Sequence, residues 1–141
     1  MIAKFFDALI PFAPLVLRIG LGVAFTFHGA QKVFGIWDGK GVDAMAENVA
    51  GMGFPFPVFF AWAAALSEFA GGIMVFFGLF TRFAAFFQVI TMCVAFFGVH
   101  HASFLQHADG AFLYGMAALA LVFGGGGKCA IDNLIFKHKK A

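Results

Sequence analysis

The sequence predicts an all-α protein: a bundle of four transmembrane helices with a short interfacial amphipathic helix between helices 1 and 2. Two observations support this fold class. Hydrophobic residues make up 62% of the 141-residue chain and charged residues only 11%, whereas soluble domains average about 25% charged residues. The apolar residues also gather in four segments, each long enough, or nearly so, to cross a bilayer as a helix.

We expect one integral membrane domain over residues 1–141, with its shortest span last. The spans cover about residues 13–34, 56–79, 82–99 and 110–124.

Two further helices are expected outside the spans. Residues 1–12 form a short interfacial helix. In the polar connection 38–57, Asp43, Glu47 and Asn48 alternate with apolar residues, which indicates an amphipathic helix on the membrane surface. The glycines and prolines of the 51–57 segment then end that helix.

The positive charges predict the orientation. Four spans place both termini on one side, and positive residues gather on the cytoplasmic side of membrane proteins. Only Lys32 and Lys40 lie on or near the opposite side. The side of the termini holds Lys4, Arg18, Arg82, Lys128, Lys137, Lys139 and Lys140. We therefore expect a multi-pass protein of the inner (plasma) membrane, with no cleaved signal and both termini in the cytoplasm.

Glu68 is the most informative residue, because it is an acid inside an apolar span. A carboxylate at that depth needs a partner, a proton or a function. Its helical face is otherwise made of small residues, which let another helix come close; these are Ala61, Ala64, Ala65, Gly71, Gly72 and Val75. Glu68 is therefore expected to face the protein interior.

The first span supplies Arg18, His28 and Lys32. Counting the helical rise along the two spans places Arg18 and Glu68 at similar depth, so we expect them to be in contact. Two interpretations stay open: an ion pair that only fixes helix register, and the polar floor of a quinone or proton site. His28 and Lys32 are one turn apart and are expected to line one cavity. Arg82, at the inner end of the third span, is read either as a headgroup anchor or as part of the site.

The remaining motifs exclude several classes of function. The chain has no Ser-His-Asp set, HExxH or CxxCH motif and no phosphate-binding loop after a strand, which disfavours hydrolase chemistry, covalent haem and flavin or nucleotide binding. A net charge of +2 is too small to suggest nucleic acid. His28, His100, His101 and His107 lie on the outward side, but the adjacent pair points in different directions, so no metal ligand is assigned.

An ordered series of short motifs resembles the DoxX family of four-helix membrane proteins. The series is Arg18-Ile19-Gly20, His28-Gly29-Ala30-Gln31-Lys32, Gly53-Phe54-Pro55, Glu68-Phe69-Ala70-Gly71-Gly72, Gly78-Leu79-Phe80-Thr81-Arg82 and Ala130-Ile131-Asp132. The resemblance implies a link to membrane redox processes. Some relatives belong to a thiosulfate:quinone oxidoreductase, and others associate with thiol or oxidative-stress proteins. One departure is the fourth span, where the family often has a Glu and this chain offers Asp109.

The resemblance and the polar residues together predict a quinone-interacting subunit of a membrane oxidoreductase complex. Glu68 and His28 are the expected catalytic residues, and the quinone is expected to enter between helices 1 and 2. The expected cofactor-binding residues are Arg18, His28, Lys32, Glu68 and Arg82. Electrons would come from another subunit or a soluble redox partner. Two alternatives stay open: a non-catalytic accessory subunit of a respiratory or other membrane complex, and a small-molecule or metal carrier that uses the outward histidines.

Overall fold

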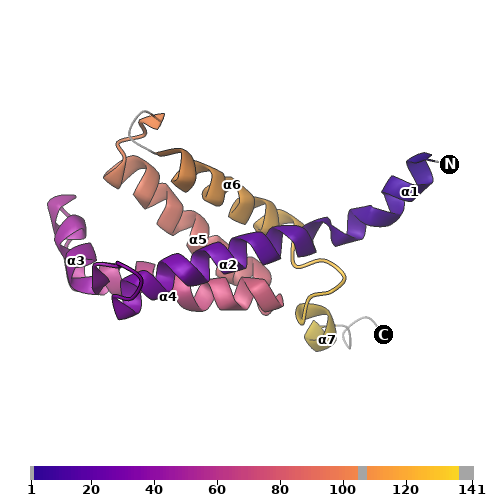
Figure 1. The fold of residues 1–141 in the computed structure, drawn as a ribbon, viewed down its shortest axis with the longest axis horizontal. Helices are drawn as coiled ribbons and strands as arrows, with labels where there is room; N and C mark the ends of the chain where they lie inside the picture. The colour runs from indigo at the N-terminus through magenta and orange to yellow at the C-terminus, as the bar shows by residue number, and fades with distance from the viewer. Residues whose placement is uncertain (1, 105–107, 137–141) are drawn as a thin grey trace.

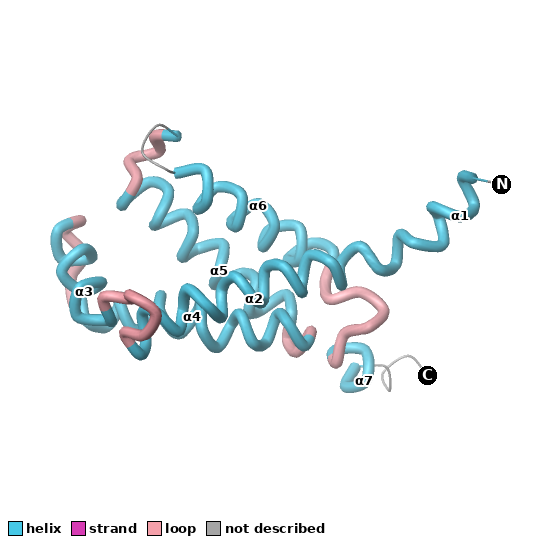
Figure 2. Tube along the Cα trace, viewed as in Figure 1, coloured by secondary structure: helices cyan, strands magenta, loops and turns pink. Residues whose placement is uncertain are grey.

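The computed structural model describes residues 2–104 and 108–136, and this part of the chain contains helices and loops but no strand (Figures 1 and 2). The elements are α1 (Ile2–Leu9), η1 (Ile10–Phe12), α2 (Ala13–Phe34), α3 (Gly41–Gly51), α4 (Pro57–Phe77), α5 (Thr81–Val94), the π-helical turn η2 (Ala95–Val99), α6 (Ala108–Gly124) and α7 (Asp132–Phe136).

The bundle is built from two antiparallel pairs, α2 with α4 and α5 with α6, joined by contact between α4 and α5. Helix α1 continues from α2 away from the bundle, and α7 lies near the same end, so the two ends of the described chain share one end of the molecule (Figure 1). Helix α3 lies at the other end, against α4.

Three helices are long and apolar enough to cross a membrane, which agrees with the first three expected spans. They are Lys4–Phe34, which includes α2, then Pro57–Phe77 and Thr81–Val99. Helix α6 is apolar but has only 17 residues. Its crossing of the bilayer, and the position of α3 on a membrane surface, remain predictions.

The phenylalanines face outward. Of those whose burial the structure describes, only Phe25 is buried, at 2% exposure. In water such a surface would aggregate, whereas lipid tails accept it at no cost. The surface therefore suits the membrane environment that the composition predicts.

Glycines set the close contact between α2 and α4. A Cβ added to Gly22 would lie 2.7 Å from the Cβ of Phe76, and one added to Gly29 would overlap the backbone of Phe69. Small residues at such positions let two helix backbones approach. These two contacts also fix the register of the antiparallel helices, because moving seven residues along α2, from Gly22 to Gly29, moves seven residues back along α4, from Phe76 to Phe69.

Candidate functional site

Lys32 and Glu68 form an ion pair between α2 and α4. Glu68 is 1% exposed and lies on the small-residue face of α4, so the prediction that it faces the interior is confirmed. Both of its carboxylate oxygens lie 2.5 Å from the Nζ of Lys32. The Lys32 side chain is 34% exposed. The pair therefore runs from the protein interior to an accessible surface.

His28 lies one turn before Lys32 on the same side of α2, but it points toward α6. Its ring is 6.2 Å from the ring of Tyr114, centroid to centroid, and its Nδ1 is 3.3 Å from the Oε1 of Gln31. The side-chain amide of Gln31 in turn donates to the carbonyl of Trp37. His28 itself is exposed. Lys32, Glu68 and His28 thus form a short polar series from α4 toward α6.

The expected contact between Arg18 and Glu68 is wrong. Arg18 is 2% exposed and donates three hydrogen bonds of 2.9–3.0 Å to backbone carbonyls, those of Val75, Phe76 and Gly126. Two of these carbonyls, those of Val75 and Phe76, belong to the last turn of α4, where the helix no longer supplies an N–H four residues on. The Val75 carbonyl also accepts a hydrogen bond from the N–H of Gly78. A cation there also complements the helix dipole. Arg18 therefore caps α4 and fastens the glycine-rich loop to it.

The register between the helices explains the error. The prediction from sequence placed the outer ends of the first and second spans at the same depth in the membrane. The glycine contacts instead place Glu68 beside Ala30 and Arg18 beyond Phe77. The offset is about twelve residues, or about 18 Å along the helix. The first turns of α4 extend past the end of α2 and pack on α3 instead.

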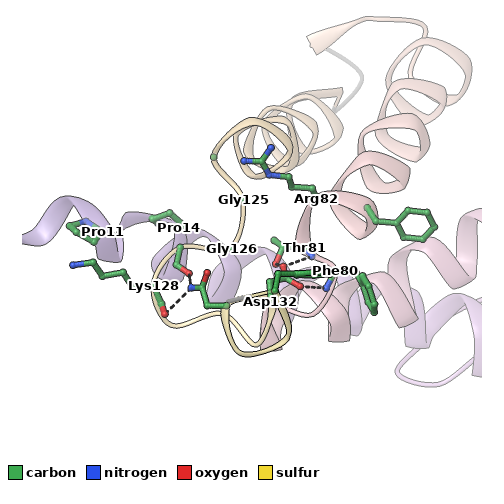
Figure 3. A pocket seen from close by; sticks show the side chains of 14 residues that line it. Pro11, Pro14, Phe80, Thr81, Arg82, Gly125, Gly126, Lys128 and Asp132 are labelled. Atoms are coloured by element: carbon green, nitrogen blue, oxygen red, sulfur yellow. Dashed lines mark hydrogen bonds between the residues drawn. The ribbon is translucent and has the colours of Figure 1, made fainter. Parts of the chain in front are cut away.

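Arg82 also lies away from the pair. It is an exposed residue in the first turn of α5 and lines a cavity at the same end of the bundle as α7 (Figure 3). The structure therefore joins Lys32 to Glu68, with His28 one turn away on α2, and places Arg18 and Arg82 at the other end.

The outward histidines give no metal centre in the part of the chain that the structure covers, because no three His, Cys, Asp or Glu side chains there are grouped closely enough to hold an ion. His107 belongs to the residues outside the described ranges.

An apolar groove of about 570 Å³ follows the contact between α2 and α4. Phe27, Ala30 and Phe34 line it from α2, and at 100° per residue these positions lie nearly opposite Lys32. The groove and the ion pair are therefore on different faces of α2. The close contact of Gly29 with Phe69 separates them.

Sequence reasoning gave no structural role to two polar residues. Gln88 on α5 is fully buried, and its amide makes no hydrogen bond within the described residues. Asp132 accepts hydrogen bonds from the backbone N–H groups of Phe80 and Thr81 and from the Thr81 hydroxyl, so it caps α5 from the far end of the chain. Gln88 could have been noticed in the sequence, because it is a single amide within the apolar span 82–99. Nothing near Asp132 in sequence indicated its partners.

Comparison with known proteins gives a family and three relatives. The family model described as DoxX matches residues 13–101, which covers α2 to η2. A protein of Haemophilus influenzae described as uncharacterized is 35% identical over 90% of this chain and 93% of its own. A Bacillus subtilis protein named "Putative oxidoreductase CatD" is 31% identical over 89% of each chain. A second uncharacterized H. influenzae protein is 31% identical over 87% of this chain and 83% of its own. No solved structure matches.

Proposed function

This chain belongs to the DoxX family, and we propose that it is a quinone-interacting subunit of an oxidoreductase complex in the inner membrane, with both termini in the cytoplasm. The observation that carries the proposal is the buried Glu68 carboxylate, held by a Lys32 ammonium that is itself accessible. Ionisable residues within spans are rare and often mark ligand and proton pathways. The name of the B. subtilis relative supports the oxidoreductase association.

The polar series fits the oxygen of a quinone. A lysine ammonium has three donors, and its two bonds to Glu68 leave one for a ligand carbonyl. The exposed His28 ring offers a second donor near the same level. A quinone supplies two-electron, two-proton redox chemistry when bound.

Each residue then has a separate role. Lys32 orients the ring oxygen, His28 donates to it and exchanges a proton with the surface, and Glu68 balances the charge of Lys32. The ring approaches from the side of His28 and Tyr114, because the contact between α2 and α4 is closed by Gly29. Electrons are supplied by a partner subunit or a soluble redox protein.

The test is quinone binding by protein reconstituted in lipid nanodiscs, followed by native mass spectrometry and by fluorescence quenching. We expect Lys32→Gln and His28→Ala to weaken binding about tenfold each, as loss of a hydrogen bond to a charged or polar group implies. Lys40→Gln is the matched control, because Lys40 is exposed at the start of α3. Unchanged binding in the first two variants would remove the proposed site.

A non-catalytic accessory subunit is the second candidate. The observation that favours it is that the ion pair joins α2 to α4 directly, as a register-fixing contact would. In that case the protein would co-purify with its complex, carry no quinone, and keep its partners in the Glu68→Gln variant. A stoichiometric quinone lost in the same variant would support the redox site instead.

A further inference from the structure

A second cavity, of about 600 Å³, opens at the end of the bundle that is opposite α3 (Figures 1 and 3). Its walls come from four parts of the chain: the prolines before and at the start of α2, the first residues of α5, the Gly124–Gly127 loop and α7. The loop has no side chains to fill the space. Gly125 leaves room for Arg82, since an added Cβ would lie 3.2 Å from its Nε.

Among residues 2–104 and 108–136, two cations line this cavity, Arg82 and Lys128. Both are exposed, and neither side chain makes an ion pair or hydrogen bond with any described residue. Figure 3 shows them on two sides of the glycine loop. Arginine and lysine side chains left without an anion in a concave site are well suited to bind phosphate.

Asp132, the acid that lines the cavity within the described residues, is already satisfied. Asp132 accepts three hydrogen bonds, from the Phe80 and Thr81 N–H groups and the Thr81 hydroxyl, at 2.6–2.9 Å. It therefore neutralises the amino-terminal end of α5 and leaves the two cations available. The buried Arg18 adds positive charge behind the loop through its bond to the Gly126 carbonyl.

The position of the cavity indicates which anion reaches it. It lies where α2 begins, α4 ends and α5 begins, so it lies at headgroup level if these helices cross the bilayer. Phe80, Phe83 and Phe136 line the cavity and are also exposed, at 47%, 62% and 51%. Their rings offer apolar contact beside the cations, as a lipid with a phosphate head and acyl chains requires.

We propose that this cavity binds the phosphate group of an anionic phospholipid, with Arg82 and Lys128 as the cations that attract it. This site is separate from the Lys32–Glu68 pair and does not depend on the quinone proposal. It also gives the two cations a ligand, with the glycine loop forming the floor of the pocket.

The test uses the full chain in nanodiscs that contain phosphatidylcholine with or without phosphatidylglycerol, and native mass spectrometry counts the retained lipid. We expect one phosphatidylglycerol to be retained, and Arg82→Gln with Lys128→Gln together to reduce its retention at least about tenfold. Lys40→Gln, at the opposite end of the bundle, should leave it unchanged. Arg82→Lys, which preserves the charge, should retain most of the binding.

A competition arm distinguishes the two sources of phosphate. If inorganic phosphate fails to displace the lipid, the ligand is the phospholipid. If inorganic phosphate displaces it and binds with the same dependence on Arg82 and Lys128, the phosphate site stands and its ligand is the free anion. Equal retention of phosphatidylglycerol and phosphatidylcholine, or retention unaffected by the double substitution in a protein with unchanged melting temperature, would overturn the proposal.

Discussion

Lys32 on α2 donates to both carboxylate oxygens of Glu68 on α4, although Glu68 is buried and Lys32 is about one-third exposed. The pair joins residues that are 36 positions apart in the sequence. Through Lys32, the buried carboxylate is linked to the accessible surface of the protein. The free energy of this ion pair therefore matters for both candidate functions.

Removing Lys32 alone should destabilise the protein more than removing both partners. Lys32→Met leaves a buried carboxylate without a counter-charge, at a cost of about 2–4 kcal/mol once the partial exposure of Lys32 is allowed for. Lys32→Met with Glu68→Gln removes that charge and should recover most of the loss. Thermal unfolding in detergent of the wild type, the two single variants and the double variant completes a double-mutant cycle. Additive effects of the two substitutions would mean that the ion pair contributes no coupling.

Arg18 should be required for stability as an arginine, not only as a cation. It satisfies three carbonyls at once, and a lysine cannot reproduce that planar fork. Arg18→Lys should therefore cost about 2 kcal/mol, because the carbonyls of Phe76 and Gly126 lose their donor. The control is Arg82→Lys, because Arg82 makes no such bonds and lies exposed. Equal melting temperatures for the two variants would contradict the capping role of Arg18.

The sequence was sufficient to predict the helices and the burial of Glu68. Apolar segments and Gly-Pro breaks placed three spans within a few residues of α2, α4 and the helix from Thr81 to Val99. The small-residue face of α4 indicated that Glu68 would be buried, because a charge needs protein around it in a bilayer. These features depend on local pattern alone.

The partner of Glu68 could not be read from the same patterns. Its identity depends on how far α2 slides along α4, and that offset is set by the packing of Gly22 against Phe76 and Gly29 against Phe69. The partners of Asp132 could not be predicted for a similar reason, since they lie about fifty residues earlier in the chain. Tertiary contacts decide both pairings.

Gly29 should tolerate no side chain. A Cβ there would overlap the backbone of Phe69, so Gly29→Ala must push α2 and α4 apart and should cost about 1–3 kcal/mol. Gly20→Ala is the matched control, because nothing lies within 4 Å of its added Cβ. Since alanine favours helix over glycine, that variant should be neutral or more stable by up to about 1 kcal/mol. If both variants melt alike, the close helix contact is not present in solution.

Gln88 should be replaceable by an apolar residue with a gain in stability. Its buried amide makes no hydrogen bond within the described residues and packs against Gly71, where its Nε2 is 3.3 Å from an added Cβ. An unsatisfied buried amide costs about 1–3 kcal/mol, and methionine has nearly the same length with no group to satisfy. Gln88→Met should therefore raise the melting temperature. Gln31→Met is the control that should lower it, because the Gln31 amide donates to the carbonyl of Trp37 at 2.9 Å. A loss of stability in Gln88→Met would contradict this prediction, because it would mean that the buried amide is hydrogen-bonded in the folded protein.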